Sequence, residues 1–105
     1  MMTREDAIKA LEDYRVLIDA LDLRLLEALN ERTRVVEEIG RVKRAGRLPI
    51  YEPRREDQVF ENVMRHNRGP LSEEAVKRIF ERIIDEMRRI QRVRMETSAD
   101  GDSEC

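Results

Sequence analysis

The longest stretch without a helix breaker constrains the fold of this chain more than any other sequence feature. Between Thr3 and Arg44 there is no proline, and Gly40 is the only glycine. Thr3 followed three residues later by Asp6 is typical of a helix N-cap with an acidic third position. The stretch therefore predicts one α-helix of about 40 residues, which at 1.5 Å per residue is roughly 60 Å long.

Apolar residues recur along this stretch in a near-regular seven-residue repeat of the coiled-coil kind. They are Leu11, Tyr14, Ile18, Leu21, Leu25, Ala28, Val35, Ile39 and Val42. A compact domain of this size is roughly 35 Å across, so the predicted helix must extend beyond it with part of its apolar seam exposed. A second copy of the chain is the simplest cover for that seam, and we expect a homodimer.

The rest of the chain predicts two further helices. The sequence GRLP at 46–49 ends the first helix, and Pro53 suits the first turn of a second helix that runs to about His66. Ser72, followed by two glutamates, is a good cap for a third helix. We expect an all-α fold with a three-helix protomer in one domain over residues 1–97, followed by a disordered acidic tail over 98–105.

Composition argues against several classes of partner. Charged residues make up 42% of the chain, but the two signs are interleaved and the formal net charge is −2, so no basic surface for nucleic acid is expected. The single cysteine, Cys105, has no partner for an intrachain disulfide or a metal site. No apolar stretch suits a signal sequence or a membrane span. We expect a cytoplasmic protein without metal, nucleic-acid or membrane partners.

Polar residues stand at several positions where the helical pattern calls for apolar ones. Arg32 takes an aliphatic place in the seven-residue repeat, and Lys43, eleven residues later, projects from the same face. Arg15 lies at the edge of that face. Glu56 on the second helix and Gln91 on the third share the apolar side of their own helices. All three predicted helices thus direct a polar group toward a shared interior.

Each of these positions also has a simpler explanation. Arginine and lysine often lay their stems along apolar surface and keep their charges in water, and Glu56 suits the positive end of its helix. Taken together, three inward cations against Glu56 leave a surplus of two positive charges, and Arg55 adds to it if it faces inward. A small dianion would balance that surplus. No inward His or Cys offers a nucleophile or proton shuttle, and no glycine-rich loop suits a nucleotide.

The residues in these positions match a known family. The sequence resembles the AroQ-type, all-helical chorismate mutases over residues of about 7–93. The matching stretches are RVLIDALDLRLL (15–26), NERTRVVEEIGRVK (30–43), PIYEPRRE (49–56) and IFERIIDEMRRIQ (79–91). The resemblance implies an intertwined homodimer that converts chorismate into prephenate, in aromatic amino acid biosynthesis, without a cofactor.

The resemblance also implies a role for each inward polar residue. Arg15 would reach into the site of the other protomer and, with Arg32, grip substrate carboxylate. Lys43 would contact a carboxylate and the ether oxygen, and Gln91 would donate to the same ether oxygen. Glu56 would accept a hydrogen bond from the ring hydroxyl. Lys43, Gln91, Arg32 and Glu56 are the expected catalytic residues.

Three further positions complete the implied substrate site. Arg55 would add positive potential and help to orient the site. The backbone at Glu52 would assist at the ring hydroxyl, although many relatives have Asp at this position. Met87 stands where many relatives have a small residue, often a serine that hydrogen-bonds a carboxylate, and a thioether cannot donate such a bond.

Other functions fit parts of the pattern. Isochorismate pyruvate lyases and aminodeoxychorismate mutases use a similar cationic pocket on the same fold. A non-catalytic helical dimerisation module would explain the repeat, with Arg32 as a polar residue that sets the register of a coiled coil. That module would not explain why Lys43, Glu56 and Gln91 occur together. Docking of another enzyme of the pathway, with a regulatory effect, also stays open.

Overall fold

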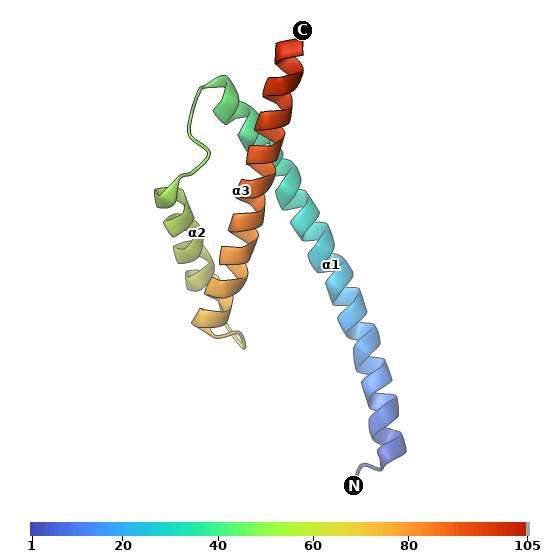
Figure 1. Ribbon diagram of the computed structural model, residues 1–105. Helices are drawn as coiled ribbons and strands as arrows, with labels where there is room; N and C mark the ends of the chain where they lie inside the picture. The colour runs from blue at the N-terminus through green and yellow to red at the C-terminus, as the bar shows by residue number, and fades with distance from the viewer. Residues whose placement is uncertain (105) are drawn as a thin grey trace. The chain divides into compact units, whose positions relative to one another are not determined.

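The computed structural model describes the backbone of residues 1–104 and the side chains of residues 1–94. Three helices follow one another along the chain: α1 (Arg4–Ala45), α2 (Pro53–His66) and α3 (Glu73–Glu104) (Figure 1). Residues 1–104 contain no strand, so the all-α prediction is confirmed. The tail expected to be disordered, 98–105, falls outside the residues described in full. Within the described part, no helix is both long and apolar enough to cross a membrane.

The first helix begins at the predicted cap. The Asp6 backbone N–H donates to Oγ1 of Thr3 at 3.1 Å, and the Thr3 N–H donates to Oδ2 of Asp6 at 3.1 Å. This reciprocal pair satisfies two backbone donors at the start of α1. The hydrogen bonds that Thr3 makes, from its backbone first and its side chain second, lower the pKa of the Asp6 carboxyl below its ordinary value.

The first helix also ends where the sequence predicts, although a different residue makes the turn. The residue in the left-handed region is Arg47, with a φ of 55°, and not Gly46 beside it. The Leu48 N–H then donates to the carbonyl of Lys43 at 2.7 Å, which is the long hydrogen bond of a Schellman motif. The chain after α1 is thereby folded back onto the last turn of the helix.

The loop between α2 and α3 is built by side chains that bond to the backbone. Asn67 accepts from the Gly69 N–H at 3.0 Å and donates to the Leu71 carbonyl at 2.8 Å. Gly69 has a φ of +75°, which its lack of a Cβ permits. Ser72 then caps α3 by accepting from the Ala75 N–H at 3.1 Å.

The chain divides into two compact units, residues 1–34 and residues 35–105. The first unit is the N-terminal part of α1, and most of its large apolar side chains are exposed. They are Ile8, Leu11, Tyr14, Val16, Leu17, Ile18, Leu21, Leu23, Leu25 and Leu26. A single chain therefore leaves the predicted seam uncovered.

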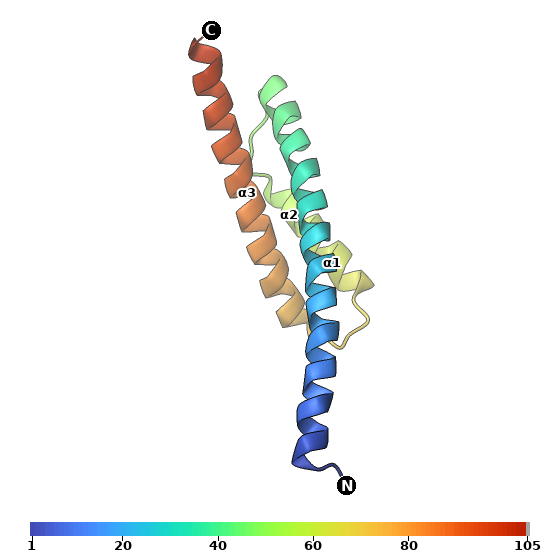
Figure 2. The ribbon, with the colours of Figure 1, turned by 90° about the vertical axis from the view of Figure 1, so that its right-hand side faces the viewer.

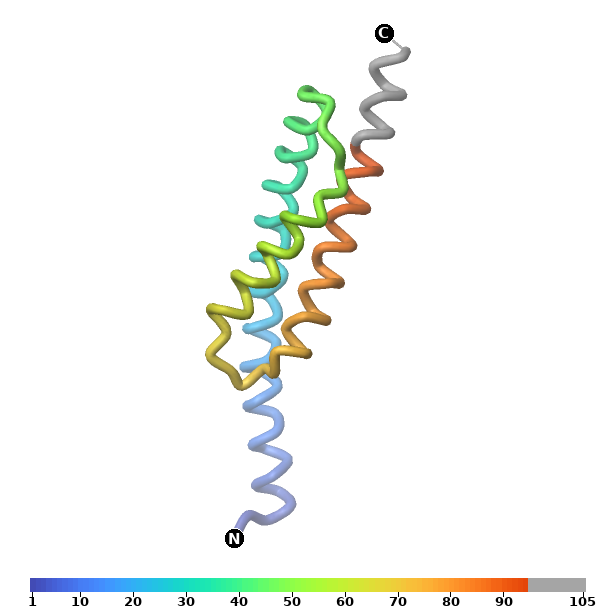
Figure 3. The backbone as a smooth tube through the Cα atoms, turned by 90° about the vertical axis from the view of Figure 1, so that its left-hand side faces the viewer, coloured from blue at the N-terminus to red at the C-terminus, as the bar shows by residue number. Residues whose placement is uncertain are grey.

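The second unit holds the last turns of α1 together with α2 and α3. Helices α2 and α3 pack against one another, and they lie side by side in Figures 2 and 3. The buried apolar residues of the described part are Val36 on α1 and Val76, Ile84 and Met87 on α3. This core is small, and every functional contact described below lies within this unit.

Candidate active site

Lys43, near the end of α1, has a buried amine with two oxygen partners. Its Nζ donates to the carbonyl of Ile50 at 2.9 Å and forms an ion pair with Oε1 of Glu52 at 2.8 Å. A buried ammonium is costly unless oxygen atoms replace the lost water, and these two contacts supply that replacement. The loop between α1 and α2 therefore brings a carbonyl and a carboxylate to one cation.

Gln91 on α3 is the second buried polar side chain and lies against α1. Its Nε2 donates to the carbonyl of Val36 at 3.2 Å, and the residue is 7% exposed. Gly40 stands opposite, where an added Cβ would lie 3.6 Å from the Gln91 Cγ. Val36, Gly40 and Lys43 are the buried residues of α1, spaced four and three apart, so they share one face of the helix. That face carries one site residue, Lys43, and contacts another, Gln91.

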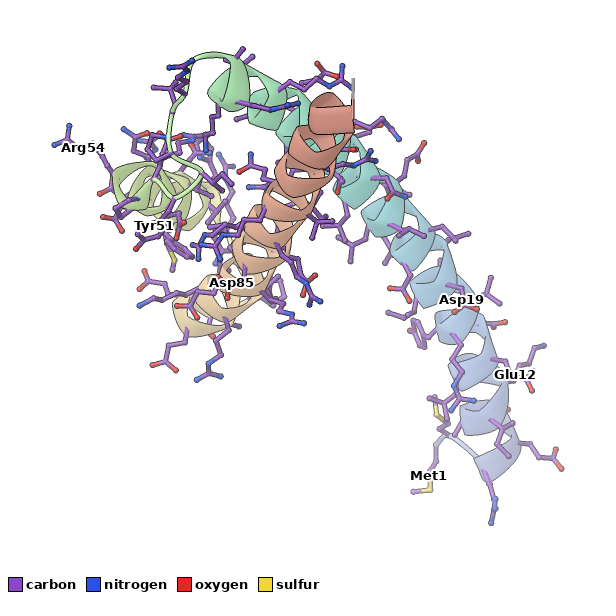
Figure 4. The ribbon with its side chains drawn as sticks, turned by 45° about the horizontal axis from the view of Figure 1, so that its top comes forward. Met1, Glu12, Asp19, Tyr51, Arg54 and Asp85 are labelled. Carbon is purple, nitrogen blue, oxygen red and sulfur yellow. The ribbon has the colours of Figure 1, made fainter. Side chains whose placement is uncertain are left out.

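Glu56, in the first turn of α2, is half-buried and ion-paired across the unit. Its Oε2 accepts a hydrogen bond from Nη2 of Arg88 on α3. The guanidinium of Arg88 also lies over the ring of Tyr51, 4.8 Å from its centroid, and Nη1 is 3.8 Å from Oδ1 of Asp85. Figure 4 labels Tyr51 and Asp85, which mark the two sides of this contact. The Glu56 carboxylate is therefore held between α2 and α3.

Arg88 contacts a candidate site residue, Glu56, although the sequence pattern did not predict it as part of the site. A usable signal was present, because Arg88 precedes Gln91 by three residues and therefore lies on the same side of α3. The contact with Glu56 spans 32 residues of sequence, which no local pattern indicates.

The structure groups some of the expected residues and not others. Glu52 contacts Lys43 through its side chain, whereas the sequence led us to expect a backbone contact with substrate. Met87 is buried beside Arg88, and Arg55 on α2 is exposed. The second unit thus holds Lys43, Glu52, Arg55, Glu56, Met87 and Gln91.

The two remaining site residues belong to the first unit. Arg15 is exposed on α1, and Arg32 is half-buried on the same helix. The charge count made from sequence also changes, because it took Glu56 as the only inward anion. In the second unit Glu52 pairs with Lys43 and Glu56 pairs with Arg88, so two carboxylates lie beside two cations there.

The donors of this site suit anion binding and charge stabilisation. A buried ammonium and a buried carboxamide can both donate to a developing negative charge, and neither requires a proton transfer. Among the residues described in full, no group of three or more His, Cys, Asp or Glu side chains is placed to hold a metal ion. The arrangement favours a reaction that needs orientation and electrostatic stabilisation.

Comparison with known proteins places the chain in one family. Residues 14–92 match the family described as chorismate mutase type II. A bifunctional chorismate mutase/prephenate dehydratase of Pseudomonas aeruginosa is 41% identical over 88 residues, which is 79% of this chain and 23% of that protein. The protein of the same name in Aquifex aeolicus is 36% identical over 73% of this chain and 22% of its own length. The chain spans under a quarter of the length of these relatives.

A solved structure extends the likeness to the fold. The chorismate mutase of Thermus thermophilus, in its form II, superposes with a TM-score of 0.78 at 29% sequence identity. The match covers 79% of this chain and 94% of the Thermus chain. Two of the three helices carry buried polar groups in a fold shared with that protein. The family match over residues 14–92 and the identity with the Pseudomonas protein show that this chain belongs to the chorismate mutase type II family.

Proposed function

We propose that this chain is a chorismate mutase, an isomerase that rearranges chorismate into prephenate. The observation that carries the proposal is the burial of two hydrogen-bond donors, Lys43 and Gln91, within one unit of a chain that belongs to this family. The contact of Gln91 with α1, on the face that also bears Lys43, supports a role for both in one site. The match to the Thermus enzyme over nearly all of that chain supports it further.

The proposed reaction is a Claisen rearrangement within one molecule. The ether C–O bond breaks as a new C–C bond forms, the electron pairs move around a six-membered ring of atoms, and no proton is transferred. Negative charge develops on the ether oxygen in the transition state. Lys43 and Gln91 would donate to that oxygen, and one such fixed donor in a water-poor site is typically worth about 3–4 kcal/mol.

The arginines would hold the substrate in its reactive shape. The enolpyruvyl arm of chorismate must lie over the ring, and clamping both carboxylates restricts it to that conformation. The planar forks of Arg15 and Arg32 suit bidentate contacts with carboxylates, and Arg55 would add positive potential. Glu56 would accept from the ring hydroxyl. Met87 offers no donor, so we expect one carboxylate contact fewer than a serine would give.

We further propose that the active enzyme is a homodimer with Arg15 contributed across the interface. Support comes from the apolar side chains that a single chain leaves exposed along residues 1–34. Leu25, which is 58% exposed, lies within the seven-residue repeat, whereas Leu23, which is 68% exposed, lies on the other side of α1. Leu25→Asp should convert the dimer into monomers in analytical ultracentrifugation, whereas Leu23→Asp should leave the dimer intact.

The experiment that tests the function is incubation of the purified protein with chorismate. Loss of the ultraviolet absorbance of chorismate together with formation of prephenate is the expected result. Release of pyruvate from isochorismate instead would identify a lyase, and turnover of aminodeoxychorismate would identify the related mutase. A folded dimer without turnover of any of these would favour the dimerisation module.

Mixing two inactive variants tests the shared site. Arg15→Ala and Arg32→Ala protomers, combined by unfolding and refolding, should form hybrid dimers in which one of two sites is intact. Activity of the mixture should approach a quarter of the wild-type rate, because half of the dimers are hybrids. A mixture as inactive as its parents would contradict the contribution of Arg15 across the interface.

Two expectations extend the proposal to the cell. The names of the Pseudomonas and Aquifex relatives pair a chorismate mutase with a prephenate dehydratase, which supports another enzyme of the pathway as a functional partner of this chain. The cytoplasmic location expected from the sequence stays a prediction.

A further inference from the structure

Arg88 stands at the centre of a contact that nothing in the predicted site accounts for. Its guanidinium bonds to the Glu56 carboxylate on one side and lies over the Tyr51 ring on the other. The Arg88 and Glu56 side chains are 23% and 24% exposed, so this is a largely desolvated ion pair between α3 and α2. The pairing joins a residue without an assigned role to the proposed acceptor of the substrate hydroxyl.

The guanidinium of Arg88 is oriented by its contacts with Glu56 and Tyr51, and its Nε is left without a hydrogen bond. This Nε is buried, and leaving a buried donor unpaired is costly. A guanidinium that merely satisfied its own donors would orient Nε toward an acceptor. Here the guanidinium lies over the aromatic ring and Nη2 donates to one carboxylate oxygen.

The same contact fixes which oxygen of Glu56 remains available. Oε2 accepts from Arg88, so Oε1 is the oxygen that stays open to another donor. A carboxylate on a flexible side chain rotates about its last bond, and the ion pair removes that freedom before substrate arrives. Such preorganisation lowers the cost of making a hydrogen bond in the transition state.

We propose that Arg88 is a positioning residue for the proposed mutase reaction: it holds Glu56 so that Oε1 faces the ring hydroxyl of the substrate. This inference rests on the proposed function, and within it Glu56 touches the substrate while Arg88 acts only through Glu56. Tyr51 supports Arg88 through the contact of its ring with the guanidinium. The effect of Arg88 is therefore specific to substrates that carry the ring hydroxyl.

If Arg88 served only to stabilise the fold, its replacement would give a different kinetic result, so a structural role can be distinguished from a positioning role. Replacing one partner of a partly buried ion pair with an apolar side chain changes stability, but it affects every substrate alike. Arg88→Met removes the charge and also the unpaired Nε, which offsets part of the loss and favours a folded variant. Arg88→Lys restores a cation without the planar fork.

The experiment measures kcat and KM of the full chain on chorismate and on an analogue that lacks the ring hydroxyl. We expect Arg88→Met to lower kcat/KM on chorismate about 10- to 100-fold and Arg88→Lys to recover part of that loss. On the hydroxyl-free analogue, Arg88→Met and wild type should agree within about twofold. Arg89→Met, at an exposed arginine on the same helix, is the matched control and should match wild type on both substrates.

A double-mutant comparison completes the test. The double variant Arg88→Met/Glu56→Gln should lose no more kcat/KM on chorismate than Glu56→Gln alone, because the two residues act through one contact. If Arg88→Met does not fold, Tyr51→Leu serves instead, since it removes the ring that holds the guanidinium and should show the same dependence on the hydroxyl. Equal losses on both substrates, or independent effects of the two changes, would overturn the inference. A wild-type chain that leaves chorismate unchanged would refute the proposed function itself, a result distinct from these.

Discussion

Lys43 and Glu52 form an ion pair in which the lysine side chain is largely buried and the glutamate side chain is exposed. Nζ and Oε1 are 2.8 Å apart, and the side chains are 11% and 48% exposed, respectively. The amine is thus enclosed while its anionic partner lies at the surface. An ammonium has three donors, and one of them serves the Ile50 carbonyl. The two substrate contacts expected for Lys43, with a carboxylate and with the ether oxygen, need both of the others, so a bound substrate must replace Glu52.

Neutralising Glu52 should therefore improve substrate binding. Glu52→Gln keeps the length of the side chain but removes the anion that competes for Lys43, so KM for chorismate should fall about two- to fivefold. Partly exposed ion pairs contribute up to about 1 kcal/mol, which sets that range. Steady-state kinetics at low and moderate salt measure the change. A KM that rises would mean that Glu52 helps to hold the substrate.

Removing the amine of Lys43 should nearly abolish turnover. Lys43→Met preserves the aliphatic stem and should lower kcat about 10²- to 10³-fold, as expected for the loss of one fixed donor to a developing oxyanion. Circular dichroism should show that the variant remains helical. The control is Lys77→Met at an exposed position of α3, which should retain full activity. A Lys43→Met enzyme with wild-type kcat would refute the assignment.

The close approach of α1 and α3 at Gly40 gives a graded test. In Gly40→Ala the new Cβ would make an ordinary contact of 3.6 Å with Cγ of Gln91, so the variant should fold and keep its activity. Alanine in a helix interior should add about 0.5–1 kcal/mol of stability over glycine and raise Tm by a few degrees. Gly40→Leu should displace Gln91 and cost at least about tenfold in kcat. Thermal melts and prephenate assays on both variants check this, and an unimpaired Gly40→Leu enzyme would contradict the site.

The capping box at the start of α1 should respond to acid. The pKa of Asp6 is lower in the folded chain than in the unfolded one, so its contribution to stability is fully present above the ordinary, unfolded pKa of an aspartate. That contribution is lost as the pH falls through the lower, folded pKa. The protection of the amides of residues 5–8, which is their exchange rate relative to that of an unstructured peptide at the same pH, should therefore fall in acid. Thr3→Ala should already show low protection at neutral pH and a smaller change with acid; an acid response identical to wild type would argue against the cap.

The helices were predictable from the sequence because their boundaries depend on local chemistry. Thr3 and Ser72 cap α1 and α3 with side-chain oxygens, and Pro53 opens α2, so a few neighbouring residues determine each start. The end of α1 illustrates the limit of such signals. The break falls where glycine and proline predicted it, but the left-handed conformation is taken by Arg47, since the turn is fixed by the bond from Leu48 to Lys43.

The candidate site was only partly predictable for a related reason. Helical spacing identified Lys43 and Gln91, because both share faces with apolar neighbours and are buried. Spacing says nothing about which charges meet across helices, so the partners of Lys43 and Glu56 were not foreseen. Those pairings depend on how α2 packs against α3 and on the path of the loop before α2.

Lys43 also ties down that loop, since its backbone carbonyl accepts from Leu48 and its amine donates to Ile50. One residue thus sets the direction in which the chain leaves α1 and also carries the positive charge that the proposed reaction would use. If residues 46–52 were lengthened by even one amino acid, we expect that Lys43 could no longer bond to Leu48 through its carbonyl and to Ile50 through its amine at the same time. Natural variation in the length of this connection should therefore be rare among active members of the family, even though loops of this kind usually tolerate insertions.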